Sequence, residues 1–133
     1  MEAHDRSYRR ALEEIREGRK QSHWMWYIFP QIVGLGLSST SRFYAIADLE
    51  EARAYMQHPM LGAHMIEICG VLLGLSANDA EDVMGYPDDL KLRSSMTLFS
   101  QAVPSVKIFQ QVLDKYFDGK MDQKTLEILG AHI

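Results

Sequence analysis

Hydrophobic residues recur along the chain at the spacing of α-helices. In the first such segment, residues 5–17, they fall at i, i+3, i+4 and i+7, the pattern of one buried helical face. These positions are Tyr8, Ala11, Leu12 and Ile15. Asp5 is placed to cap the start of this helix, and Gly18 is placed to end it. The pattern therefore predicts an amphipathic helix near the beginning of the chain.

Capping residues and prolines predict where further helices begin. Asp48, followed by Glu51, is a capping pair for a helix over residues 49–57. Pro59 suits the first position of a largely apolar helix over 60–73, which we expect to be the central core helix. Pro87 opens a long helix, whose apolar positions are Leu92, Met96, Phe99 and Val103. The other predicted helical segments are 22–29, 42–47, 79–84, 105–117 and 122–129, and residues 31–41 are predicted to form a loop.

The fold class follows from these signals. No segment alternates apolar and polar residues as a half-buried β-strand does. Signals for the start or end of a helix recur about every 15 residues, and no repeat of a fixed period is present. The sequence predicts an all-α fold, in which residues 1–133 form a single domain built as an irregular multihelical bundle of about seven helices.

One stretch, Ser22–Gln31, is unusually aromatic. It holds both tryptophans of the chain and is apolar on every side, so the other helices must enclose it. Polar residues nevertheless open it at Ser22 and His23 and close it at Gln31. We therefore expect a buried element with polar residues at both of its ends.

Composition narrows the class of protein. The chain has 133 residues, of which 47% are hydrophobic and 24% charged, as in ordinary soluble globular domains. No apolar run approaches the roughly 18 residues of a membrane-spanning helix, and the N-terminus lacks the hydrophobic core of a secretory signal. Cys69 is the only cysteine, which excludes an internal disulfide and favours a reducing compartment. We therefore expect a cytoplasmic protein that has no membrane partner.

Charge is unevenly distributed along the chain. A net charge of −4 argues against a nucleic-acid partner, because phosphate neutralisation needs a basic surface. Residues 6–20 carry six basic side chains against three glutamates, whereas residues 79–89 carry five acidic side chains and no basic one. Such blocks are usually two solvated faces. The alternative is a small basic lip beside the aromatic stretch.

The segment Lys91–Phe99 carries more polar groups than a plain core helix. Lys91, Ser94 and Ser95 share one helical face, and Arg93 lies on another with Asp89 and Thr97. Adjacent serines are poor helix formers, so another role should favour them. A lysine, an arginine and two hydroxyls within two turns can hold a phosphate or a carboxylate. The structural alternative is an Asp89–Arg93 surface pair, with the serines bonded back to their own helix.

Polar residues near the aromatic stretch suggest one opening. It would be lined by Lys20, His23, Gln31, Tyr44 and His58. Trp24 or Trp26 would stack on a planar ligand there, although tryptophans at this spacing are more often core residues. If the protein is an enzyme, His23 is the candidate acid or base. The histidines and carboxylates lack the spacing of a metalloenzyme, and His64 with Glu67 alone is thin evidence, so neither a metal nor a cofactor is expected.

Several motifs, taken in order, resemble a known family. They are Ser22–Gln31, Gly34-Leu35-Gly36, His58-Pro59 with Leu61-Gly62, and Asp88–Phe99. Over nearly its whole length the chain resembles the bacterial domain-of-unknown-function family 1810, whose members are small, all-helical and uncharacterised. Some members carry a calpastatin label, although calpastatin is a disordered inhibitor and this chain has the composition of a packed domain. The resemblance implies the fold and leaves activity, substrate and cofactor open.

Together these patterns support one leading hypothesis. The domain binds a small anionic ligand, nucleotide- or phosphosugar-like, between the Ser22–Gln31 and Lys91–Phe99 segments. The candidate site residues are Lys20, His23, Trp24, Trp26, Gln31, Tyr44, His58, Lys91, Arg93, Ser94 and Ser95. The alternative is a protein–protein interaction module without a small-molecule site, and its partner would be unknown. Ligand identity, catalysis and oligomeric state stay open at this point.

Overall fold

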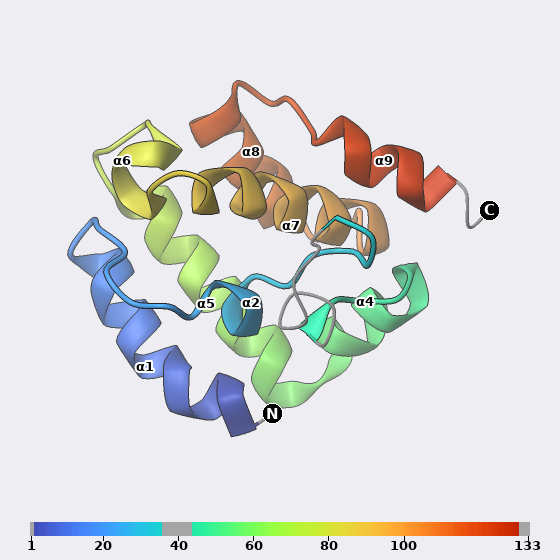
Figure 1. Cartoon of the computed structure of the whole chain (residues 1–133), viewed down its shortest axis with the longest axis horizontal. Helices are drawn as coiled ribbons and strands as arrows, with labels where there is room; N and C mark the ends of the chain where they lie inside the picture. Colours follow the sequence, from blue (N-terminus) through green and yellow to red (C-terminus); the bar gives the residue numbers. More distant parts are fainter. Residues whose placement is uncertain (1, 36–43, 131–133) are drawn as a thin grey trace.

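Eight helices make up the described part of the chain, which in the computed structural model comprises residues 2–35 and 44–130 (Figure 1). The helices are α1 (Glu2–Arg16), α2 (Met25–Ile28), α4 (Leu49–Gln57), α5 (Pro59–Gly74), α6 (Ala80–Met84), α7 (Asp88–Ala102), α8 (Ile108–Phe117) and α9 (Gln123–Gly130). Within these residues the only β-type pairing is an isolated parallel bridge between Ile32 and Ile46. The predicted all-α, multihelical fold is confirmed.

Helix α7 is the element that the others surround. It crosses the middle of the molecule and packs against α4, α6, α8 and α9 (Figure 1). Nine of its 15 residues are buried, compared with five of the 16 residues of α5. The expectation that the apolar segment 60–73 is the central helix was therefore wrong. Helix α5 leaves Ile66 exposed to solvent, whereas α7 is enclosed so completely that its hydroxyl-bearing residues are buried as well.

Several predicted helix ends are confirmed by the contacts of their capping residues. The Asp48 carboxylate accepts a hydrogen bond from the backbone N–H of Glu51 at 2.8 Å, and Pro59 is the first residue of α5. Asp122 accepts a hydrogen bond from the backbone N–H of Thr125 at 2.9 Å, just ahead of α9. These local signals act within one turn of the chain, which is why the sequence alone reveals them.

Other boundaries differ from the prediction. Helix α1 begins at Glu2, so Asp5 lies inside it, and α2 begins only at Met25, with Trp24 in the capping position in place of Ser22. Residues 45–47 are not helical, because Ile46 pairs with Ile32. The rest of the predicted turn at 42–47 and most of the predicted loop at 31–41 lie outside the described residues, apart from Tyr44 and residues 31–35. Among the described helices, none combines the length and the apolarity needed to cross a bilayer.

The corner between α4 and α5 depends on a glycine. A Cβ atom at Gly62 would lie 2.1 Å from the backbone oxygen of Met56, a separation that no real contact allows. The last turn of α4 can approach the first turns of α5 this closely only because residue 62 has no side chain. Gly70, further along α5, has no neighbouring atom within 4 Å of the same position.

These two glycines make a matched pair for a stability measurement. We predict that Gly62→Ala lowers the free energy of unfolding by about 1–3 kcal/mol, because the methyl group forces the two helices apart. Gly70→Ala should raise it by about 0.5–1 kcal/mol, because alanine is the better helix former where there is room. Urea unfolding of both variants checks this. Equal effects at the two positions would contradict the close approach of α4 to α5.

Candidate functional site

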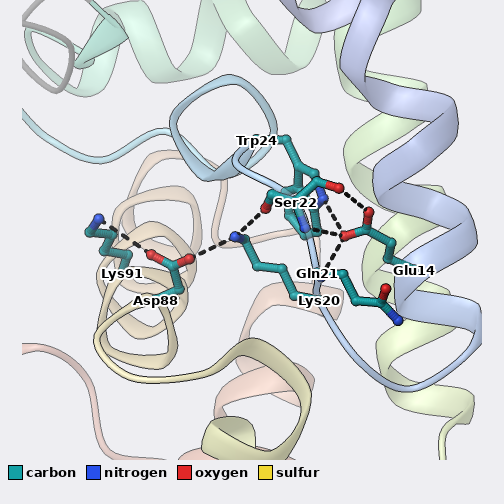
Figure 2. A network of polar contacts seen from close by, with 7 residues as sticks. All are labelled: Glu14, Lys20, Gln21, Ser22, Trp24, Asp88 and Lys91. Atoms are coloured by element: carbon teal, nitrogen blue, oxygen red, sulfur yellow. Dashed lines mark hydrogen bonds and ion pairs between the residues drawn. The ribbon is translucent and has the colours of Figure 1, made fainter.

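The aromatic stretch is held in place by one buried carboxylate, that of Glu14 in α1. It accepts hydrogen bonds from the backbone N–H groups of Gln21 and Ser22 at 2.7 and 2.9 Å. It also accepts bonds from the Ser22 hydroxyl at 2.5 Å and from the indole N–H of Trp24 at 2.9 Å (Figure 2). Burial alone would raise the pKa of Glu14, but these four donors outweigh burial and lower that pKa to about 2. The carboxylate therefore stays ionised and fixes residues 21–24 against α1.

Trp24 belongs to the core. Its side chain is 1% exposed, and its only polar atom is bonded to Glu14. Its ring lies against Phe29, with 6.2 Å between the ring centroids. Trp24 has neither an exposed face nor a spare donor to offer a ligand.

Two lysines share one aspartate beside the aromatic stretch. The Nζ atom of Lys20 lies 2.8 Å from one oxygen of Asp88, and the Nζ atom of Lys91 lies 3.3 Å from the other oxygen (Figure 2). Lys20 also donates to the backbone oxygen of Ser22 at 2.5 Å, and its side chain is only 7% exposed. The Lys91 side chain is 26% exposed. Lys20 therefore joins the aromatic stretch to α7, whereas Lys91 keeps access to solvent.

Trp26 lies against Lys91. The Lys91 ammonium is 4.7 Å from the centroid of the Trp26 ring, a cation–π contact. The indole N–H of Trp26 is buried and has no hydrogen-bond partner among the described residues. Buried polar groups normally have partners, so this N–H is a donor to which the described residues supply no acceptor.

Trp26 forms one wall of a pocket of about 250 Å³. Its lining includes Trp26, Tyr27, Pro30, Tyr44, Glu51 and Tyr55. Tyr27 and Tyr44 meet edge to face, with centroids 4.7 Å apart. We call this space the aromatic pocket.

The aromatic pocket contains a second buried donor. The Tyr55 hydroxyl is buried and, like the Trp26 N–H, lacks a hydrogen-bond partner within the described part of the chain. Burial raises the pKa of Tyr55 far above its ordinary value, so the hydroxyl keeps its proton. A ligand in this pocket would meet aromatic faces and the Glu51 carboxylate, and the two donors belong to side chains of the pocket wall.

Four of the sequence-predicted site residues come together here. Trp26 and Tyr44 line the aromatic pocket, and Lys91 lies on the Trp26 ring. Gln31 lines a smaller neighbouring hollow, to which Trp26 and Tyr44 also contribute. The aromatic stretch and the start of α7 thus meet at Trp26 and Lys91.

The other predicted residues of α7 lie elsewhere or are bonded within the protein. Arg93 donates to the backbone oxygens of Lys120 and Met121, at 2.9 Å each, and so holds the segment that leads to α9. Ser94 donates to the backbone oxygen of Leu90 at 3.1 Å. Ser95 is fully buried, and its hydroxyl has no partner among the described residues. The Asp89–Arg93 ion pair of the structural alternative is absent from the described residues, where Asp88 forms both ion pairs.

The two predicted histidines also lie apart from the aromatic pocket. His58 caps α5, because its Nδ1 atom accepts hydrogen bonds from the N–H groups of Met60 and Leu61 at 3.2 and 3.3 Å. His23 is exposed and lines an open hollow together with Arg6 and Arg10 of α1. Arg6 and Arg10 come from the basic block 6–20, for which a lip beside the aromatic stretch was the alternative to a solvated face.

Sequence reasoning missed part of the pocket, namely Tyr27, Glu51 and Tyr55. The spacing of Glu51 and Tyr55 at i and i+4 did carry a signal, because it places both on one face of α4. Among residues 2–35 and 44–130, no group of three or more His, Cys, Asp or Glu side chains is arranged to hold a metal ion.

Comparisons with known proteins place the chain among uncharacterised relatives. Residues 1–129 match the family model described as "Protein of unknown function (DUF1810)". The structure is similar to the crystal structure of the conserved hypothetical protein Rv1873 from Mycobacterium tuberculosis, with 44% sequence identity and a TM-score of 0.94. The alignment covers 96% of this chain and 91% of that chain. No curated protein matches the chain. The resemblance drawn from the sequence motifs is confirmed.

Glu14 gives a test of the network that positions the aromatic stretch. We predict that Glu14→Gln lowers the free energy of unfolding at pH 7 by about 2–3 kcal/mol, because a neutral amide cannot satisfy four donors. The exposed neighbour Glu13→Gln is the control and should change it by less than about 0.5 kcal/mol. Urea unfolding measures both variants.

The same network predicts a pH dependence. The folded-state pKa of Glu14, about 2, lies below the ordinary value of 4.5, so its contribution to stability is complete above that value and is lost as the pH falls toward 2. Glu14→Gln should flatten the loss of stability across this range. Parallel acid-unfolding curves for the variant and the wild type would contradict the assignment.

Proposed function

The chain belongs to the DUF1810 family, whose function is unknown, and we propose from the geometry of the aromatic pocket that it binds a small anionic ligand with a planar, nucleotide-like group. The observation that carries this proposal is that Trp26 and Tyr55, which both line one aromatic pocket, carry buried donors that have no partner among residues 2–35 and 44–130.

The aromatic walls of the pocket are the reason to expect a planar group on the ligand. Indole and phenol faces stack well on flat heterocycles, and few other groups gain as much from such walls. A volume of about 250 Å³ suits a heterocyclic base or a similar ring system and is too small for a whole dinucleotide. These features favour the nucleotide-like ligand over the phosphosugar.

The polar contacts follow from the two donors. An unsatisfied buried donor costs about 1–3 kcal/mol, so a ligand that brings an acceptor to Trp26 or Tyr55 gains this energy on binding. Ring nitrogens and carbonyl oxygens of heterocyclic bases are acceptors of this kind. The pocket therefore matches the edge of a base as well as its face.

Lys91 is the reason to expect an anionic group on the ligand. Its ammonium lies on the same indole that walls the pocket, and it shares Asp88 with Lys20. Lys91 is therefore the cation on the Trp26 side of the pocket, which the Glu51 carboxylate also lines. A phosphate or carboxylate attached to the planar group would meet this cation.

A protein-interaction role has less support. The large exposed hydrophobic residues within the described residues are Val33, Met60, Ile66, Tyr86 and Leu90. They come from three separate stretches of the chain, and an apolar docking surface would give no reason for two buried donors that lack partners in the described part of the chain.

Thermal unfolding across a panel of nucleotides, nicotinamide dinucleotides, ADP-ribose and sugar phosphates tests the proposal. A ligand at about 100 times its dissociation constant adds roughly 2.7 kcal/mol, which in a domain of this size raises the melting temperature on the order of 8 °C. We expect a shift for at least one mononucleotide. No shift for any compound of the panel would contradict the proposal.

Two substitutions locate the binding. We predict that Lys91→Gln and Tyr55→Phe each weaken binding about tenfold, because one removes the cation and the other the buried donor. Lys124→Gln, an exposed lysine of α9, is the matched control for lost charge and should bind as the wild type does. Arg93→Gln should lower stability and leave affinity unchanged. Wild-type affinity in both Lys91→Gln and Tyr55→Phe would place the ligand elsewhere.

A further inference from the structure

A second feature of the structure lies outside the role proposed for the aromatic pocket. It is a chain of hydrogen bonds that runs through two histidines from α2 to α5. His4 of α1 is 5% exposed, and its Nδ1 atom lies 2.9 Å from the backbone oxygen of Tyr27. Its Nε2 atom lies 2.9 Å from the Nδ1 atom of His64 in α5. The two histidines are 60 residues apart in the sequence.

The partners of His4 determine where the protons are. The Tyr27 carbonyl can only accept, so Nδ1 of His4 carries a proton and donates it. Burial lowers the pKa of His4, so the ring is neutral and its Nε2 atom is an acceptor. The proton of the second bond must then come from Nδ1 of His64. In a neutral His64 ring, Nε2 is left with a free lone pair.

Neighbouring rings hold His64 in this orientation. Tyr8 stacks on it with centroids 3.6 Å apart and an angle of 2° between the ring planes, and His4 lies nearly parallel at 5.1 Å. The Tyr8 hydroxyl donates to the Glu67 carboxylate, and burial raises the pKa of Tyr8, so this bond persists at neutral pH. The His64 ring therefore has a fixed position as well as a fixed tautomer.

The free nitrogen of His64 is open to solvent. His64 lines a hollow of about 460 Å³ together with Asp5, Tyr8, Arg9, Leu12 and Met60. Its Nε2 atom has no hydrogen-bond partner within residues 2–35 and 44–130, and it is not among the enclosed polar atoms. Asp5 and Arg9 bring opposite charges to the hollow, so its charges do not favour an anionic substrate.

We propose that this hollow is a second chemical site, in which Nε2 of His64 is a nucleophile toward activated acyl groups such as esters. The Nε2 lone pair forms a bond to the carbonyl carbon, the bond to the leaving oxygen breaks, and the leaving group departs with that electron pair. During attack, the positive charge that develops on the ring is stabilised by the Nδ1–H bond to His4 and by the face of Tyr8. The guanidinium of Arg9 is the cation available to the carbonyl oxygen as it becomes negative.

The bond to His4 also favours release of the acyl group. The acylated ring passes its Nδ1 proton along the hydrogen bond to Nε2 of His4, the base in contact with it, and this leaves a neutral acyl-imidazole. Hydrolysis by water breaks the nitrogen–carbon bond, forms the free acid and returns the proton to Nδ1, which restores the bond. The acyl-imidazole is therefore an intermediate, and the site turns over.

The other described histidines provide internal controls. His23 has no hydrogen-bond partner among the described residues, so its ring is not oriented. The Nδ1 lone pair of His58 is used by two backbone N–H groups, and both nitrogens of His4 are used. Of these four rings, only His64 combines a fixed tautomer with an open lone pair.

Turnover of 4-nitrophenyl acetate tests the proposal. The released 4-nitrophenolate is followed well beyond seven equivalents per protein, because the six lysines and the amino terminus can each be acylated only once. We expect multiple turnover by the wild type, a loss of at least about tenfold in His64→Gln, and wild-type turnover in His23→Gln. Absence of turnover in the wild type, or wild-type turnover in His64→Gln, would overturn the proposal.

His4 is a positioning residue in this account, and two substitutions separate positioning from folding. His4→Phe keeps a ring in the stack and removes the acceptor, so turnover should fall about tenfold. His4→Gln offers an amide oxygen as acceptor and should retain more activity than His4→Phe, whatever the relative stabilities of the two variants. Equal activity in His4→Phe and the wild type would remove His4 from the site. If His4→Phe fails to fold, the comparison of wild type with His64→Gln still decides the proposal.

Discussion

The arrangement of this protein depends on one buried carboxylate, that of Glu14. Four donors from three residues, Gln21, Ser22 and Trp24, converge on it, and together they fix residues 21–24 against α1. Without this anchor the aromatic stretch would have no defined orientation, because a four-residue helix such as α2 is too short to be stable by itself. With it, Trp24 is directed into the core, and Trp26, two residues later, lies beside α7 and the aromatic pocket.

The enclosure of α7 explains why its sequence looked functional. Buried hydroxyls of this helix donate to backbone oxygens of the same helix, as Ser94 does to Leu90, Thr97 to Arg93 and Ser100 to Thr97. Arg93 is likewise used to hold the segment before α9. Lys91 differs, because it stands at the start of the helix where solvent still reaches it. A helix buried on all sides thus satisfies most of its polar groups internally and offers a ligand only those at its exposed end.

Much of the fold could be predicted from the sequence, because helical periodicity and capping are local. The stripe of α1, the Asp48 cap and the first residue of α5 all depend on residues within two turns of one another. The site could be predicted only in part, because its contacts join distant segments. Nothing near Ser22 indicates that its hydroxyl donates to Glu14 in place of capping a helix. Nor does the sequence around His4 or His64 indicate their bond, since the rings meet only through the packing of α1 on α5.

Binding of a planar anionic ligand beside Trp26 can be measured directly, because the two tryptophans report on it separately. The chain has only two indole N–H groups, of which that of Trp24 is bonded to Glu14 and that of Trp26 has no partner among the described residues. Each gives its own signal in a ¹H–¹⁵N NMR spectrum, so titration with nucleoside monophosphates follows both at once. If the ligand binds beside Trp26, the Trp26 indole signal shifts in a saturable way while the Trp24 signal stays in place. A Trp26 signal that does not move with any of these ligands, or equal movement of both signals, would contradict binding there.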